Sequence, residues 1–160
     1  MRHIHRDGEE SIEFGRYLEA LATYRDRLPK EVALFAGDEE RFVLDHPKSL
    51  HDARLERLTI SETEGSDNRP SFVKLELLLR GQQGDRHIRI TYREVERYEI
   101  RGKKGELGSH DSHHGDIYTH EVRVGESGGV VHEVLFASGS VIETECADFQ
   151  VQDEIDSTNG

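Results

Sequence analysis

The sequence lacks several features that would place it in a defined class. A single cysteine, Cys146, excludes an intramolecular disulfide framework and favours a reducing compartment. No apolar stretch approaches the roughly 20 residues that a membrane-spanning helix needs. The polar start of the chain also lacks the apolar core of a secretory signal. We therefore expect a cytoplasmic protein without a membrane segment.

Positive charge is missing from the last part of the chain. Residues 124–160 contain eight acidic residues and neither lysine nor arginine, and the whole chain has a net charge of -12. Phosphate backbones repel such a chain, so nucleic acid is not an expected partner. The acidity favours a basic protein as partner, although acidic residues also serve simply to keep a protein soluble.

Alternating side chains predict a sheet at the centre of the chain. In residues 72–80 and 86–92, apolar side chains recur at nearly every second position, which is typical of strands with one buried face. The loop between them contains Gly81 and Gly84, so the two strands are predicted to form a hairpin. Further strands are predicted at residues 54–61 with a bulge, 95–100, 117–124, 130–136 and 141–146, with an edge strand at Phe149 and Val151.

The N-terminal part has helical spacing instead. Ser11 is a candidate N-cap, and the apolar residues after it recur every three or four positions: Phe14, Tyr17, Leu18, Leu21, Tyr24 and Leu28. Pro29 should end this helix, and a second, shorter helix is predicted at residues 31–35. Residues 41–45 fit either a strand or the entry to a loop.

These elements predict an α+β fold, in which an N-terminal helix, or two, packs on an antiparallel sheet or meander of about six to seven strands. A length of 160 residues fits one domain. We assign residues 11–152 to it, between a flexible N-terminus (1–10) and a flexible acidic tail (153–160). Residues 102–116 lack hydrophobic periodicity and are predicted to form a long loop rich in histidine and glycine.

That loop holds the densest group of metal-capable side chains. His110, His113 and His114, followed by His120 in the next strand, have the imidazoles that zinc prefers. A single flexible loop does not hold imidazoles in the tetrahedral order of a structural zinc site. A solvated loop without a cofactor is therefore our main expectation, and a zinc-binding protein or metal-dependent hydrolase is the alternative.

A serine motif between two predicted strands has a structural explanation. Residues 125–129 match the G-x-S-x-G pattern of a nucleophile elbow around Ser127, and they resemble the nucleophile segment of trypsin-like serine proteases. The elbow needs a strand followed by a helix, whereas residues 130–136 have the pattern of another strand. We therefore predict a glycine-rich hairpin loop and no catalytic residue.

Two further signatures are also expected to be structural. His51-Asp52 matches the dyad of HD-type phosphohydrolases, which needs further ligands on surrounding helices, so these residues are predicted to form a turn. The acidic neighbours of Cys146 disfavour its thiolate, which makes it a poor nucleophile. We predict that it lies in the core.

Several segments together resemble a group of small bacterial proteins. These segments run from Tyr17-Leu18 through Leu28-Pro29 to Leu50-His51-Asp52-Ala53, and include residues 132–139 and 142–148. They are similar to functionally uncharacterised α+β domains in which a Leu-His-Asp turn opens a series of antiparallel strands. Some domains of this style are immunity proteins of polymorphic toxin systems. The resemblance implies no catalytic site.

The resulting hypothesis is a non-enzymatic protein-binding domain, in one version an immunity-type protein against a basic toxin. The candidate binding residues are the acidic side chains of the C-terminal strands, Glu143, Glu145, Asp148, Asp153 and Glu154. Arginines of the middle third offer these carboxylates internal partners instead. A third hypothesis is a homo-oligomer formed through an exposed sheet edge.

Overall fold

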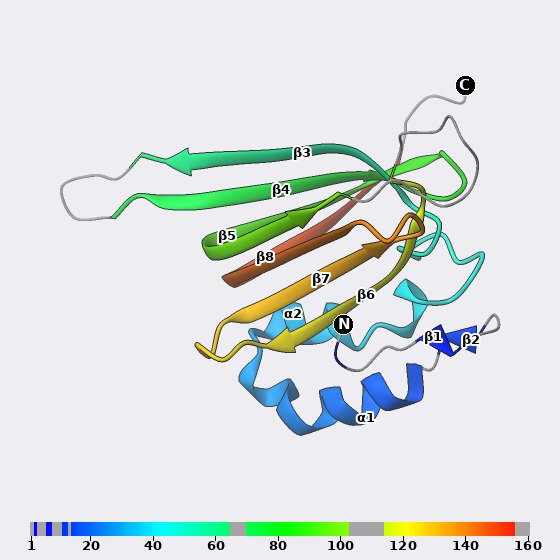
Figure 1. Ribbon diagram of the computed structural model, residues 1–160, viewed down its shortest axis with the longest axis horizontal. Coiled ribbons are helices and arrows are strands. Elements are labelled where there is room, and N and C mark those ends of the chain that lie inside the picture. Colours follow the sequence, from blue (N-terminus) through cyan, green and yellow to red (C-terminus); the bar gives the residue numbers. More distant parts are fainter. Residues whose placement is uncertain are drawn as a thin grey trace.

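The computed structural model describes residues 2, 6–7, 11–12, 14–64, 70–102 and 114–155. Within them, two α-helices and a six-stranded antiparallel sheet confirm the predicted α+β class (Figure 1). The helices are α1 (Phe14–Tyr24) and α2 (Lys30–Ala36). The sheet strands are β3 (Arg54–Thr63), β4 (Phe72–Arg80), β5 (Arg86–Arg101), β6 (Ile117–Val124), β7 (Val130–Phe136) and β8 (Val141–Ile155). Two short strands, β1 (Arg6–Asp7) and β2 (Ser11–Ile12), pair separately.

The strand order is β3-β4-β5-β8-β7-β6, so two three-stranded meanders are joined by the pairing of β5 with β8. Both joining strands are longer than predicted. The strand expected at 95–100 is the second half of β5. Phe149 and Val151 belong to β8 and are not a separate strand, but the expected edge position holds: among the described residues, β8 beyond Cys146 pairs with β5 alone. The register shifts between Val95 and Arg97, beside Glu94 with its φ of 50°. This irregularity breaks the alternation and hid the continuity of both strands.

The structure differs from the predicted elements at several other places. Ser11 belongs to β2 and is not the N-cap of α1, which begins at Phe14. Residues 39–41 form a 3₁₀ turn, and β8 continues to Ile155, so the predicted acidic tail begins inside the sheet. Most of the predicted flexible N-terminus and tail, and residues 103–113 of the long loop, lie outside the described residues.

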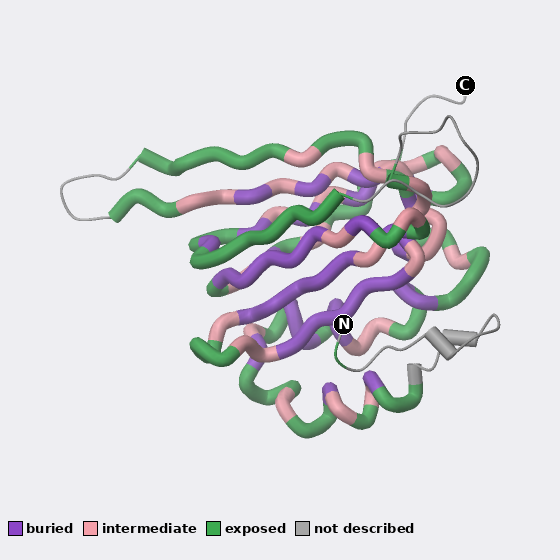
Figure 2. The backbone as a smooth tube through the Cα atoms, viewed as in Figure 1, coloured by how far each residue is buried: buried purple, intermediate pink, exposed green. Residues whose placement is uncertain are grey.

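The helices cover one face of the sheet. Helix α2 packs against β8 and α1 packs against β6 (Figure 1), and the buried stretches concentrate where strands face these helices (Figure 2). Leu77, Ile90 and Val151 are neighbours on three adjacent strands, and the first two are fully buried. Each fully buried side chain of this size contributes roughly 1.5–3 kcal/mol. None of the helices described here is long and apolar enough to cross a membrane.

Candidate functional site

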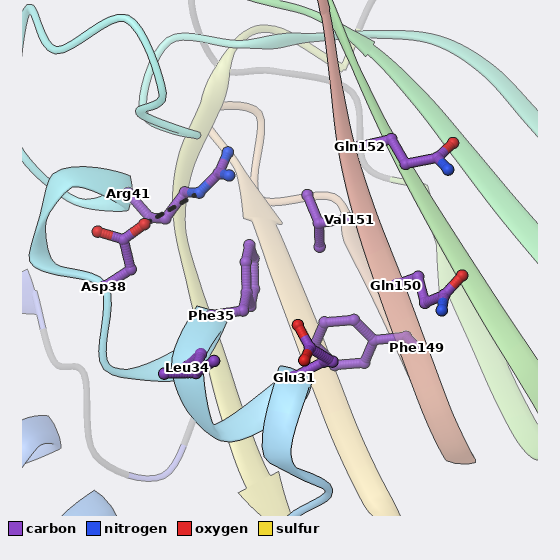
Figure 3. Close-up of a pocket in the computed structure, with 9 residues that line it drawn as sticks. All are labelled: Glu31, Leu34, Phe35, Asp38, Arg41, Phe149, Gln150, Val151 and Gln152. Atoms are coloured by element: carbon purple, nitrogen blue, oxygen red, sulfur yellow. Dashed lines mark ion pairs between the residues drawn. The ribbon is translucent and has the colours of Figure 1, made fainter.

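A groove of about 540 Å³ opens between α2 and the second half of β8 (Figure 3). Its floor is aromatic, since the rings of Phe35 and Phe149 meet edge to face with their centroids 5.4 Å apart. Val151 extends this floor along the strand. The residues that line the groove are Glu31, Leu34, Phe35, Asp38, Arg41, Phe149, Gln150, Val151 and Gln152.

Helix α2 places both apolar and acidic side chains at the groove. Val32 and Phe35 are buried on the sheet side of the helix, while Glu31 and Leu34, three positions apart, are exposed and line the groove. Leu34 is 51% exposed. The helix therefore leaves a large apolar side chain uncovered beside an aromatic floor.

Arg41 lines one end of the groove, and hydrogen bonds hold its side chain in place. Its guanidinium makes two hydrogen bonds to the Asp153 carboxylate, at 2.9 and 2.6 Å, and a third to the Lys48 carbonyl at 3.1 Å. It lies 5.6 Å from the centre of the Phe35 ring. Such a bidentate pair is stronger and more directional than a single hydrogen bond. Arg41 thereby ties the segment after α2 to β8 at one end of the groove.

The groove is acidic at its rim. Arg41 is the one cation among the lining residues, and Asp153 matches its charge. Asp38 lies 3.6 Å from the Arg41 Nε and also accepts a hydrogen bond from the Glu40 amide. Glu31, in the first turn of α2, adds an exposed carboxylate. Gln150 and Gln152 line the strand edge but extend their amides away from the helix (Figure 3). The site therefore combines an apolar floor with negative charge.

The predicted acidic binding residues mostly have partners within the chain. Glu143 lies 2.7 Å from Arg97 and 2.8 Å from Arg123. In the same set, Glu145 lies 3.3 Å from Arg97, Glu154 lies 3.1 Å from Arg89, and Asp153 is held by Arg41. For Asp148, one carboxylate oxygen is buried. Arginines of the same chain therefore engage four of these five carboxylates.

A buried ion-pair network on the other sheet face was missed by sequence reasoning. Arg123 lies between Glu133, at 3.4 Å, and Glu143, and all three are at least nine-tenths buried. Burial alone would raise the pKa of Glu143, but hydrogen bonds from Arg123 and Arg97 lower it. The signal was the placement of opposite charges at alternate positions of neighbouring strands.

The histidines of the metal hypothesis do not gather in the part of the chain that the structure describes. His110 and His113 lie outside it. His114 contacts Ser140, with Nδ1 and Oγ 3.0 Å apart, whereas His120 is fully buried in the core. Among the described residues no group of three or more histidine, cysteine or acidic side chains could hold a metal ion.

His120 belongs instead to a buried chain of polar groups. The Tyr92 hydroxyl lies 2.7 Å from Nδ1 of His132, and Nε2 of His132 lies 3.3 Å from Nδ1 of His120. Phe42 stacks on His120 with a centroid distance of 4.3 Å. Burial is the main cause that lowers the pKa of His132 to about 3 and the pKa of His120 well below its usual value. Both imidazoles are therefore neutral hydrogen-bonding parts of the core.

The remaining motif residues lie in turns or in the core. Ser127 lies in the expected hairpin turn between β6 and β7, and its hydroxyl donates to the Glu145 carboxylate of β8 at 2.6 Å. His51 and Asp52 lie in a turn, and the Asp52 amide donates to the Ile117 carbonyl at 2.9 Å. Burial raises the pKa of the Cys146 thiol to about 12, aided by Asp148.

Comparison with known proteins returned no matching family model, no matching curated protein and no matching solved structure.

Proposed function

We propose that this chain is a non-enzymatic protein-binding domain that holds a basic, partly apolar segment of a partner in the groove between α2 and β8. The observation that supports the proposal is the exposed Leu34 beside the Phe35–Phe149 floor, at a rim where Glu31 and Asp38 carry negative charge. Apolar anchors in a pocket, ringed by polar contacts, are the usual source of affinity in protein interfaces.

The chemistry of the groove defines the segment that fits it. The floor of Phe35, Phe149 and Val151 accepts an aromatic or branched apolar side chain, which would also cover Leu34. A lysine or arginine on either side of that anchor would reach Glu31 or Asp38. Because this charge is at the rim and partly hydrated, it contributes more to association rate and specificity than to affinity.

The narrower proposal, immunity against a basic toxin, is one biological form of this function. For this form, the groove offers a basic toxin an acidic contact with an apolar floor. Glu143, Glu145 and Glu154 are less suited to this contact because arginines of the same chain already engage them. The zinc-dependent alternative has less support, since His120 is engaged with His132 in the core.

Selection from a displayed random peptide library, with the full chain as target, tests the proposal. We expect enriched sequences that combine a large apolar residue with lysine or arginine. Leu34→Lys and Glu31→Lys should each weaken the binding of these peptides at least about tenfold, a loss of about 1.4 kcal/mol. The matched controls Ile60→Lys and Glu62→Lys, on the exposed strand β3, should leave binding unchanged.

Two results would overturn the proposal. One is the absence of any enriched basic and apolar sequence after selection. The other is an enriched peptide whose affinity is the same for wild type, Leu34→Lys and Glu31→Lys. Circular dichroism of each variant checks that the fold is intact, which we expect for these surface substitutions.

A further inference from the structure

The second half of β5 has an unpaired side, although β5 stands between β4 and β8 in the strand order. Residues 86–92 of β5 are flanked by β4 and β8, but pairing with β4 stops at Leu75 and Tyr92. Residues 93–101 continue to pair with β8 on one side only, as far as Arg101 opposite Val141. Among the residues that the structure describes, no strand occupies the other side. An unpaired edge of this length is a template for another strand.

The terminal strand β6, by comparison, has a covered edge. The free edge of β6 is covered by α1, where the Tyr24 hydroxyl donates to the Val122 carbonyl at 3.0 Å. The Val122 amide in turn donates to the Tyr17 hydroxyl at 3.4 Å. On β5, by contrast, Tyr98 and Ile100 are 44% and 43% exposed, on the face that carries the core. The β5 edge thus combines free backbone with uncovered apolar side chains.

We propose that a second copy of this chain adds to the β5 edge, antiparallel to residues 93–101, with the two-fold axis at Tyr98. A two-fold interface places the same surface of both copies together. Pairing at this edge joins the two sheets into one and brings the two Tyr98 rings side by side. It leaves the groove between α2 and β8 free, so it is independent of the proposed partner binding.

The charges on the edge select this register. With the axis at Tyr98, Arg97 of each copy lies opposite Glu99 of the other, giving two cross-strand pairs of opposite charge. Moving the axis to Arg97 places the two Arg97 side chains opposite each other. Moving it to Glu99 places the two Glu99 side chains together, and Arg97 opposite Arg101. Since like charges directly opposite destabilise a sheet, the Tyr98-centred register is the complementary one of these three.

Two cysteine variants with nearly equal exposure test the register. Residues directly opposite in an antiparallel pair have Cα atoms about 4.5–5.5 Å apart, within the range for a disulfide. Tyr98→Cys should therefore form a disulfide-linked dimer under mild oxidation of the full chain. In the Ile100→Cys variant, position 100 of one copy lies several residues along the strand from position 100 of the other copy. This variant should therefore stay monomeric on a non-reducing gel. The buried Cys146 is common to both variants and to the wild-type control.

Sedimentation of the wild-type chain across a concentration series tests the dimer itself. We expect a reversible monomer–dimer equilibrium, and Glu99→Arg should raise its dissociation constant at least about tenfold because the repulsion occurs twice. A wild-type chain that stays monomeric at all concentrations would overturn the proposal. Equal disulfide formation by both cysteine variants, or a dimer unaffected by Glu99→Arg, would also overturn it.

Discussion

Acidification to pH 5 should remove a large part of the stability of this domain because of two buried histidines. His120 and His132 are fully buried and neutral, and their pKa values lie well below the usual value, for His132 at about 3. In the unfolded chain each imidazole regains a pKa of about 6.5. At low pH the unfolded state therefore binds two protons that the folded state does not bind. As a result, the free energy of unfolding falls as the pH drops below about 6.5.

The magnitude follows from this difference in proton binding. Between pH 7.5 and 5.0, His132 lowers the free energy of unfolding by about 2 kcal/mol. His120 adds a loss of the same sign, since its pKa is also lowered on folding. Near pH 5 the slope approaches the value expected when the unfolded state binds two more protons than the folded state. Small domains have a total stability of about 5–15 kcal/mol, so the loss is a substantial fraction.

Other charged groups near the pair do not change the sign. Arg41 and Arg123 act on His120 and His132 respectively and lower their pKa values further, while Tyr92 is neutral throughout this range because burial raises its pKa. The pKa of Glu143 is lowered on folding, so its effect on stability appears only below about pH 5, as unfolded glutamate begins to bind protons. The window from pH 7.5 to 5.0 therefore lies mostly above the range in which the carboxylates bind protons.

Urea titrations followed by circular dichroism, at half-unit steps from pH 7.5 to 5.0, measure this slope. His120→Gln/His132→Gln should be less stable at neutral pH but nearly flat across the window, while the surface variant His46→Gln should keep the wild-type slope. Should the double variant not fold, NMR titration of wild type replaces it, and the His132 ring protons should not shift above pH 4. A wild-type slope below one proton would refute the reasoning.

Three further predictions follow from individual contacts. Arg41→Met should lower the free energy of unfolding by about 2 kcal/mol, because it removes the bidentate hydrogen bonds between the Arg41 guanidinium and the Asp153 carboxylate; the exposed control Lys48→Met should leave it nearly unchanged in the same urea titration. Tyr17→Phe removes the hydroxyl that bridges the Val122 amide and the Ala36 carbonyl, so it should cost about 1 kcal/mol and speed hydrogen exchange at Val122, whereas Tyr98→Phe should do neither. Cys146, buried and with its pKa raised to about 12, should react with a thiol reagent at pH 8 only after unfolding; rapid stoichiometric labelling of the native protein would contradict its placement.

Much of the fold could be predicted because local patterns agree with it. The alternation in residues 72–80 and 86–92, the helical stripe before Pro29 and the bulge in β3 all correspond to observed elements. The strand order could not be predicted, because the pairing of β5 with β8 depends on contacts between distant segments. Glu94, with its positive φ, also interrupts the period of two in β5, so one long strand appeared in the sequence as two.

The site was less predictable for a related reason. Glu31, Leu34 and Val151 are ordinary residues in sequence, and only the packing of α2 on β8 brings them to one groove. The number of acidic residues in the C-terminal strands suggested a binding surface. Their partners Arg97 and Arg123, on other strands, cancel much of that charge. Charge totals in a sequence do not reveal which carboxylates remain free after folding.

NMR titration of the ¹⁵N-labelled full chain with a peptide enriched by selection tests the central claim most directly. Partner binding in the groove predicts that the largest amide shifts cluster at Glu31, Leu34 and Phe35 of α2 and at Phe149 and Val151 of β8, and that Leu34→Lys abolishes them. Shifts centred instead on Glu143 and Glu145, or spread over the sheet away from α2, would contradict it.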